Sequence, residues 1–250
     1  MYLPPLTNLA IYAVAGLSLI LGFVSLIIFG VFLYTGSFSM VSLSLDTTGV
    51  LIFDACLCLV FFLQHTGMIR IHAKNRILQK NFKIVFSIAS GIVLSLFVIL
   101  WQESSFLIAS ADGFLRGLMR TVFFLGIAGQ IWTTVSSISV DPFGVQELMM
   151  RLDSNKSSTS TAKLVTTTGA YGWVRHPAYS TMLMLIWSYP DLTADRLLLN
   201  VLFTSWIIIG AILEERDLVG VFGEDYRAYQ RTVPMLIPYR KPRRAKIQDR

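Results

Sequence analysis

Charge is scarce in this sequence. Only 14% of its residues are charged, while 54% are hydrophobic, whereas soluble domains normally carry about 25% charged residues. The mean hydropathy is +0.62. This composition excludes an ordinary soluble domain, and it predicts an integral membrane protein.

Cysteine is nearly absent as well. The 2 cysteines, Cys56 and Cys58, are separated by one residue within an apolar run. That spacing is too short for an ordinary disulfide, and two thiols do not make a zinc site. We interpret both as core or lipid-facing side chains, and we predict no metal site.

The sequence also lacks a convincing secretory signal, an internal repeat and a soluble basic face. No basic residue precedes the first apolar run, which is longer than the roughly 7–15 residues of a signal-peptide core. The absence of a repeat disfavours a pseudo-symmetric carrier. The basic residues give a net charge of +6, but they flank apolar runs and are not interleaved with aromatic residues. They therefore predict cytoplasmic loops and no nucleic-acid partner.

Long apolar runs are what the sequence has instead. A helix needs roughly 20 residues to cross a bilayer core of about 30 Å. Four runs approach that length, and a short run, a Pro190-Asp191 turn and a longer run then predict a helical hairpin. We expect an all-α, polytopic membrane helical bundle. The expected helices are Leu9–Tyr34, Val50–Met68, Ile84–Trp101, Leu118–Val140, Tyr179–Tyr189 and Leu197–Leu213.

These runs predict three regions and an orientation. Residues 1–140 hold four transmembrane helices, 141–168 form a polar loop rich in Ser and Thr, and 169–250 hold the hairpin and a C-terminal segment. If the basic loop at residues 70–83 is cytoplasmic, both termini and the polar loop lie on that side. Few basic residues then fall on the far side, as the positive-inside rule expects.

Two polar clusters flank the predicted hairpin. Arg175 and His176 precede Pro177, a residue that suits the first turn of a helix, and helix N-termini favour anionic groups. Glu214 and Glu215 follow the second apolar run. Because a hairpin returns to its starting side, the clusters are expected to converge on a pocket for a zwitterionic or cationic small molecule.

The residues alone also allow a structural interpretation of the same clusters. Arg175 would then anchor the chain at the membrane interface, and Tyr171 and Trp173 would belong to an aromatic belt. Glu214 would begin a solvated helix end.

The order of motifs in the last third of the chain resembles a known family. Between Gly169 and Pro238 there follow Gly-x-Tyr-x-x-Val-Arg-His-Pro-x-Tyr, Glu-Glu-Arg-Asp-Leu, Phe-Gly-Glu-Asp-Tyr-Arg-x-Tyr and Val-Pro-x-x-Ile-Pro. This set resembles the membrane methyltransferases, which include isoprenylcysteine carboxyl methyltransferases and phospholipid N-methyltransferases. The segments at 141–144, Asp-Pro-Phe-Gly, and 63–70, Leu-Gln-His-Thr-Gly-Met-Ile-Arg, resemble the bacterial enzymes that make dimethyl sulfide from methanethiol.

The resemblance implies a pocket for S-adenosylmethionine on the cytoplasmic side, made by the hairpin and the C-terminal segment. Glu215 is expected to contact the amino or ribose groups of the cofactor, and Pro234 and Leu236 to close over the adenine. The implied cofactor-binding residues are Tyr171, Arg175, His176, Pro177, Tyr179, Glu214, Glu215, Tyr226, Tyr229, Pro234 and Leu236.

The implied chemistry is displacement at a sulfonium methyl group, which needs no metal. A thiol acceptor reacts as its thiolate, so a group must take its proton, and His65 and His176 are the candidates. Arg70 would favour an anionic substrate. For His65 the alternative is a buried histidine that bonds a neighbouring carbonyl.

The chain departs from the family's pattern in two places. Ser180-Thr181-Met182 stands where many relatives have Gly, which puts close helix packing there in doubt. Thr232 stands where the prenylcysteine enzymes usually have Arg. Because Arg suits a carboxylate substrate, its absence weakens the carboxyl methyltransferase interpretation.

We therefore predict S-adenosylmethionine-dependent methyl transfer to a small or lipophilic thiol that enters from the bilayer, giving a thioether. An isoprenylcysteine carboxylate or a phospholipid amine is the alternative acceptor, and a non-catalytic carrier or assembly factor is the alternative class. The basic tail, residues 240–250, is expected to be solvated and to meet anionic lipid head groups. Short loops and the lack of an organellar signal favour a bacterial inner membrane, with the cofactor site and both termini cytoplasmic.

Overall fold

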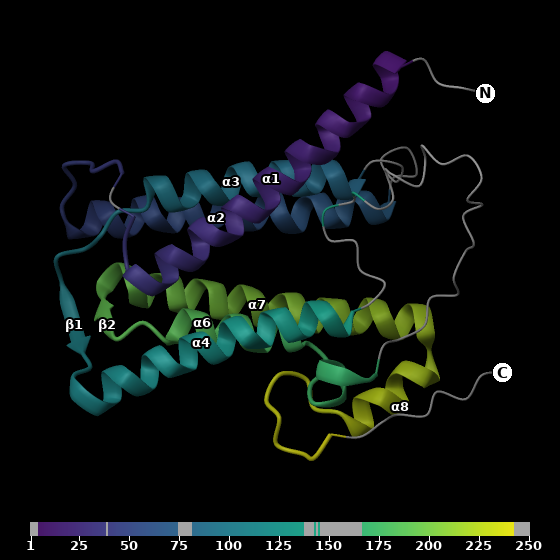
Figure 1. Ribbon diagram of the computed structural model, residues 1–250. Coiled ribbons are helices and arrows are strands. Elements are labelled where there is room, and N and C mark those ends of the chain that lie inside the picture. Colours follow the sequence, from purple (N-terminus) through teal and green to yellow (C-terminus); the bar gives the residue numbers. More distant parts are fainter. Residues whose placement is uncertain are drawn as a thin grey trace. The chain divides into compact units, whose positions relative to one another are not determined.

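The computed structural model describes residues 5–38, 40–74, 82–137, 143, 145 and 167–242 (Figure 1). The chain divides into two compact units. The first is Met1–Phe106 with Asp141–Ser160, and the second is Leu107–Val140 with Thr161–Arg250. Most of the predicted polar loop, part of the basic loop and the tail beyond Pro242 lie outside the described residues.

Within the described residues, five helices are long and apolar enough to cross a membrane. The prediction of an all-α, polytopic membrane protein is thereby confirmed. Since the bilayer core offers no water to backbone N–H and C=O groups, a spanning segment must satisfy them within its own helix. The five spans are Ile11–Thr35, Thr47–Arg70, Phe82–Leu100, Gly113–Ser136 and Ala194–Phe222.

The described part of the first unit includes the helices α1 (Pro5–Thr35), α2 (Thr47–Lys74) and α3 (Phe82–Leu100), and α3 packs against both α1 and α2. Small residues allow α1 and α3 to approach closely, as is usual for membrane helices. A Cβ atom at Gly91 would lie 2.8 Å from the carbonyl oxygen of Leu21. Bulkier residues in this seam would force the two helices apart.

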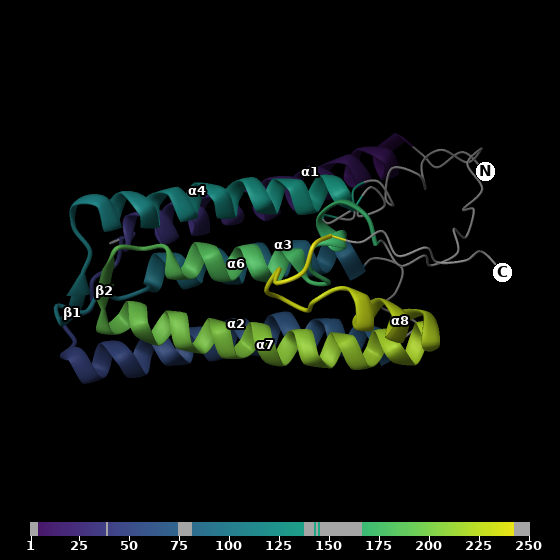
Figure 2. The same ribbon diagram turned by 90° about the horizontal axis from the view of Figure 1, so that it is seen from below.

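The second unit holds the C-terminal clusters. It comprises β1 (Leu107–Ser110), α4 (Gly113–Ser136), the 3₁₀ turn η2 (Gly169–Gly172), α6 (Pro177–Trp187), β2 (Asp191–Thr193), α7 (Ala194–Phe222) and α8 (Glu224–Thr232). In Figure 2, α6 lies between α4 and α7, and it packs against both. With 11 residues and a rise of about 1.5 Å per residue, α6 is too short to cross a bilayer. The chain then turns back through β2 into α7.

Close packing between α4 and α6 is achieved by glycines on α4. A Cβ atom at Gly126 would lie 2.7 Å from the Leu185 side chain, and one at Gly129 would overlap the methyl group of Thr181. The sequence placed close packing at residues 180–182 in doubt because α6 has no glycine there. The structure supplies the small residues from the opposite helix.

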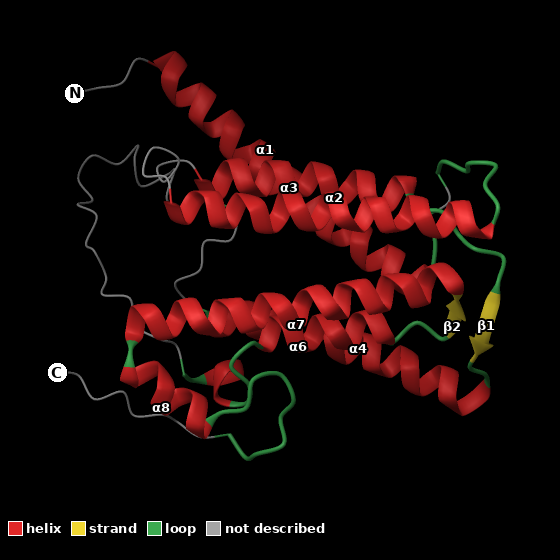
Figure 3. Cartoon of the chain, turned by 180° about the vertical axis from the view of Figure 1, so that it is seen from behind, coloured by secondary structure: helices red, strands yellow, loops and turns green. Residues whose placement is uncertain are grey.

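A two-stranded antiparallel ribbon joins the other ends of these helices, and the sequence analysis predicted no strand there (Figure 3). Ser110 on β1 lies opposite Asp191 on β2, and its hydroxyl donates to Asp191 Oδ1 at 2.6 Å. Arg116 Nη2, on α4, lies 2.5 Å from the same oxygen. The ribbon thus ties the beginning of α4 to the beginning of α7.

Candidate active site

The acidic cluster lies inside α7 instead of following it. The apolar run ends at Leu213, but the helix continues to Phe222 and ends at Gly223, which has a positive φ of 59°. Consecutive residues on a helix point about 100° apart. Glu215 is therefore buried, with 7% of its surface exposed, whereas the side chain of Glu214 is 47% exposed.

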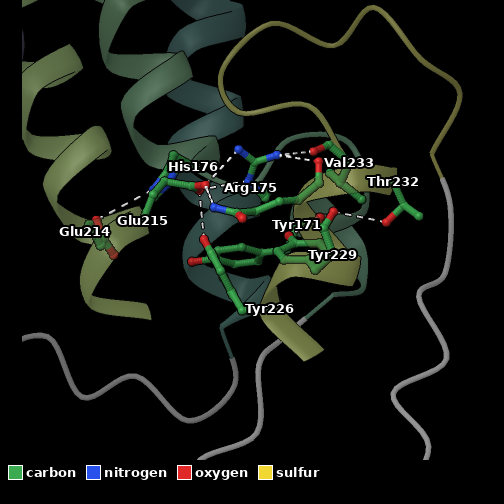
Figure 4. A network of polar contacts seen from close by, with 10 residues as sticks. Tyr171, Arg175, His176, Glu214, Glu215, Tyr226, Tyr229, Thr232 and Val233 are labelled. Atoms are coloured by element: carbon green, nitrogen blue, oxygen red, sulfur yellow. Dashed lines mark hydrogen bonds and ion pairs between the residues drawn. The ribbon is translucent and has the colours of Figure 1, made fainter. Parts of the chain in front are cut away.

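Glu215 is the centre of a buried hydrogen-bond network (Figure 4). Arg175 binds it with two parallel bonds, Nε to Oε1 and Nη2 to Oε2, both 2.8 Å long. His176 Nε2 and the Tyr226 hydroxyl each lie 2.8 Å from Oε1. Gln230 Nε2 donates to Oε2 at 2.5 Å. A buried carboxylate is costly unless it is paired and hydrogen-bonded, and these donors from α7's neighbours satisfy both oxygens.

Arg175 also binds the end of α8. Its Nη1 donates to the carbonyl oxygen of Gln230 at 3.1 Å and to that of Val233. The Gln230 carbonyl belongs to the last turn of α8, where the helix leaves acceptors without an intrahelical partner, and Val233 directly follows the helix. One guanidinium thus joins α7 and the end of α8 to the segment before α6.

Residues 233–236, which we call the C-terminal strap, pair with the segment before α6. The Arg175 N–H donates to the Pro234 carbonyl at 2.9 Å, and the His176 N–H donates to the Met235 carbonyl at 3.1 Å. Two successive backbone bonds tie the strap to this segment. The strap is therefore held by the same two residues whose side chains bind Glu215.

The first turn of α6 binds the strap as well. Pro177 is buried at the first helical position, as expected for a residue without an N–H group. The Ser180 hydroxyl, one turn later, donates to the Leu236 carbonyl at 2.6 Å. The predicted pocket residues Pro177 and Leu236 therefore lie at one end of the second unit, together with Pro234.

His176 lies between two carboxylates. Its Nε2 faces Glu215, while its Nδ1 lies 3.6 Å from Oε2 of Glu214. The ring stacks on Tyr179, with centroids 5.5 Å apart and planes inclined by 13°. Because the ionised carboxylate of Glu215 can only accept hydrogen bonds, Nε2 is the donor in this contact. Both ring nitrogens thus face carboxylate oxygens.

Tyr171 connects this network to α4. Its hydroxyl lies 2.8 Å from Ser137 Oγ, and its carbonyl accepts a bond of 2.6 Å from the Tyr229 hydroxyl. Gly169, with a φ of 61°, allows the chain to approach α4 so closely that a Cβ atom would lie 2.5 Å from Ser136 Oγ. A larger residue at that position would be both strained and in collision.

Two tyrosines of α8 are neutral donors in the network. Burial, together with the bond to Glu215, raises the pKa of Tyr226 above its ordinary value, and burial also raises the pKa of Tyr229. Both hydroxyls therefore keep their protons near neutral pH. Each can donate to an acceptor, Glu215 for Tyr226 and the Tyr171 carbonyl for Tyr229.

The structure thus brings together the predicted site residues that belong to the second unit. His65 and Arg70 belong to α2, in the first unit. The His65 ring lies between Phe61 and Phe86, with centroid distances of 5.5 and 4.8 Å, and Arg70 is exposed at the end of its span. Their part in catalysis stays a prediction.

Two residues that bind this network were missed by sequence reasoning. Gln230 lies four positions after Tyr226, and Ser180 lies four positions after His176. Residues at that spacing share a helix face. This spacing was the available signal, since each follows a predicted site residue by about one turn.

The chain is similar to several curated enzymes. It is 34% identical over 192 residues to a methanethiol S-methyltransferase of Pseudomonas sp. (strain GM41(2012)), covering 75% of this chain and 73% of that protein. It is 32% identical over 193 residues to the methanethiol S-methyltransferase of Pseudomonas deceptionensis, with coverages of 75% and 72%. The human protein-S-isoprenylcysteine O-methyltransferase is 25% identical over 150 residues, which are 54% of this chain and 51% of that protein.

No family model matches the chain, and no solved structure matches it. The two Pseudomonas enzymes are matched over almost three quarters of their own length. The chain belongs to the family of the methanethiol S-methyltransferases.

Proposed function

We propose that this protein transfers a methyl group from S-adenosylmethionine to a small thiol in the membrane, giving a thioether. The names of its relatives support the reaction and the acceptor class. The proposed site is the end of the second unit where α6 begins, centred on Glu215. We further propose that this end faces the cytoplasm of a bacterial cell, with the acceptor reaching it from the bilayer.

The observation that carries the proposal is that one of the two neighbouring carboxylates is buried and hydrogen-bonded while the other is exposed. Glu215 is buried and bound by five donor groups from Arg175, His176, Tyr226 and Gln230. Glu214 stands beside this network with nearly half of its side chain exposed. The network holds these side chains in place, and the half-exposed carboxylate of Glu214 adds a negative group at its edge.

These residues fit S-adenosylmethionine, which supplies an electrophilic methyl group on a cationic sulfonium and also carries an ammonium group. Glu214 is the exposed anion that would bind a cationic group, and Tyr179 and Leu236 offer half-buried apolar surface for the adenine. The sequence favoured Glu215 for the cofactor contact. Because its oxygens already bind the chain's own donors, we propose Glu214 for that contact and Glu215 as a positioning residue.

His176 is better suited to positioning than to taking a proton. Nε2 donates to Glu215, and Nδ1 faces Glu214, so a thiol would have to displace a carboxylate to reach either nitrogen. His65 remains our proposal for the group that takes the thiol proton, with Arg70 favouring the thiolate. Positioning of the two reactants would then supply much of the acceleration, for which about 7–11 kcal/mol is available.

A carboxylate acceptor is less well served by this site. Thr232 stands where Arg is usual in the prenylcysteine enzymes, and its hydroxyl binds backbone carbonyls of α8, at 3.2 Å from Ala228 and 3.0 Å from Tyr229. It therefore offers no positive charge to a carboxylate. This contact favours the thiol over the isoprenylcysteine acceptor.

The test is calorimetric titration of the purified, detergent-solubilised protein with S-adenosylhomocysteine, followed by an acceptor panel. We expect saturable binding that weakens in Glu214→Gln and remains in Glu224→Gln, a control on the exposed surface of α8. The panel would compare methanethiol, a prenylated cysteine and phosphatidylethanolamine. Absence of binding by folded protein would refute the enzyme and support a carrier or assembly factor.

A further inference from the structure

The chain beyond the strap presents two large apolar side chains to its surroundings. Ile237 is 73% exposed and Tyr239 is 69% exposed. The Tyr239 N–H donates to the Ile237 carbonyl at 2.9 Å, which closes a tight turn around Pro238. Since proline fixes φ near the value that such a turn needs, the exposed pair is held in place by its own backbone.

Basic side chains flank this apolar pair. Arg240 Nη1 donates to the Arg231 carbonyl at 2.9 Å, and its guanidinium lies 5.3 Å from the centroid of the Tyr239 ring. Lys241 follows and is exposed. Exposed apolar side chains next to cations allow a segment to bind a lipid surface. The apolar side chains enter the boundary between head groups and acyl chains, while the cations face the phosphate groups.

The turn also lies at the end of the second unit where α6 begins. The strap that precedes it is bound to the first turn of α6 through Ser180. At the same end, Trp132 near the end of α4 contacts Trp173, with ring centroids 6.4 Å apart, and these rings are 46% and 44% exposed. Half-exposed tryptophans typically mark the membrane–water interface.

We propose that residues 237–241, which we call the docking turn, bind the surface of a membrane that contains anionic lipids. Ile237 and Tyr239 insert between head groups, and Arg240 and Lys241 bind lipid phosphates. Their positive charge complements anionic lipid and offers nothing to a neutral apolar partner. Each basic residue is expected to shift docking by about fivefold on such a surface.

Binding of the docking turn to the membrane would affect the proposed site through the C-terminal strap. The strap's carbonyls bind the N–H groups of Arg175 and His176, so a docked turn restrains the frame around Glu215. This step rests on the proposed function. It predicts that S-adenosylhomocysteine binds more tightly in nanodiscs that contain anionic lipid than in wholly zwitterionic ones.

The first test measures docking without any ligand. Ile237→Cys, in full-length protein with Cys56→Ser and Cys58→Ala, carries an environment-sensitive dye in nanodiscs of phosphatidylcholine with or without phosphatidylglycerol. A matched label at Asp225→Cys reports the exposed surface of α8. We expect lipid-borne quenchers to reach position 237 and not 225, and we expect more quenching when phosphatidylglycerol is present.

Charge reversal separates the two parts of the proposal. Arg240→Glu with Lys241→Glu should abolish the difference between the two lipid compositions at position 237. Equal access of an aqueous quencher to both labels would overturn docking altogether. Lipid quenching that is the same in both compositions would overturn the assignment to anionic lipid. Because these readouts need no cofactor, a failure of the proposed function leaves them unaffected.

Discussion

Arg175 and Glu215 form a two-pronged ion pair between the segment before α6 and the acidic cluster on α7. Both bonds are 2.8 Å long, and only 10% and 9% of the two side chains are exposed. A planar guanidinium matches a carboxylate in this geometry, which a lysine cannot reproduce. The pair therefore couples the start of one helix to the end of another by shape as well as by charge.

We expect Arg175→Lys to destabilise the protein although it keeps the charge. Lysine would lose one bond to Glu215 and the contacts to carbonyls at the end of α8. We expect a loss of about 2 kcal/mol in the free energy of unfolding, below the roughly 3–5 kcal/mol that removing one partner of a buried pair costs. Thermal and denaturant unfolding in detergent measure it.

Arg227→Lys is the matched control for that substitution. Arg227 lies 3.6 Å from Glu224 on the exposed surface of α8, where solvent screening leaves an ion pair with little effect on stability. We expect its unfolding curve to overlay that of the unchanged protein. Equal effects of the two substitutions would show that burial of the Arg175 pair has no energetic consequence.

We predict that the hydrogen bond from Gln230 stabilises the ionised carboxylate of Glu215. A hydrogen bond to a charged group contributes about 1.5–3 kcal/mol, and Gln230→Leu should lose that amount at every pH at which Glu215 is ionised. Gln230→Glu adds a second carboxyl beside Glu215, which raises the pKa of the new group in the folded state. Its stability defect should therefore grow as pH rises above about 4.

Unfolding measured between acid and neutral pH separates the two Gln230 variants. The Gln230→Glu curve should approach that of the unchanged protein at the acid end, while the Gln230→Leu difference stays constant. If both differences were independent of pH, the new carboxyl would not feel Glu215. The hydrogen bond of 2.5 Å would then not describe the protein in solution.

The membrane-spanning helices were predictable because the length and apolarity of a segment are nearly sufficient to identify a helix that crosses a bilayer. The end of α7 was not, since the helix passes Leu213 into charged residues that a helix outside the hydrocarbon tolerates. Nor was the ribbon, whose strands have 4 and 3 residues. Its contact between Ser110 and Asp191 joins positions 81 apart in sequence, and no local pattern records such a pairing.

In the proposed site, too, contacts that follow from the local sequence were predictable and contacts between distant residues were not. A hairpin returns to its starting side, so the sequence could place Arg175 and His176 near the acidic cluster. It could not show that Glu215 is buried and Glu214 exposed, because which carboxylate turns inward depends on the rotation of α7 against its neighbours. Gln230 was missed because, apart from its spacing of four residues after Tyr226, a polar residue on a polar helix does not show which partner it binds.

Asp191 makes stability at the ribbon depend on pH. Partial burial raises the pKa of Asp191, but the hydrogen bonds from Ser110 and Arg116 lower it by more. The pKa therefore lies below its ordinary value. A depressed pKa gives stability that is present above about pH 4 and is lost as pH falls. Because the pair is partly exposed, we expect Asp191→Asn to cost about 1 kcal/mol or less near neutral pH. A cost that persisted well below pH 4 would exclude an electrostatic origin.

Gly129 is predicted to be irreplaceable at the contact between α4 and α6, while Gly117 on the same helix is not. A Cβ atom at Gly129 would overlap Thr181, whereas one at Gly117 meets nothing within 4 Å. Thr181 cannot easily move, because its hydroxyl donates to the Pro177 carbonyl at 2.9 Å and α6 carries the site at its first turn. Overpacking of this kind costs about 1–3 kcal/mol. We expect Gly129→Ala to lower the unfolding temperature and weaken S-adenosylhomocysteine binding, and Gly117→Ala, a favourable change in a helix, to do neither; equal tolerance of both would mean that α4 and α6 are not in contact at this point.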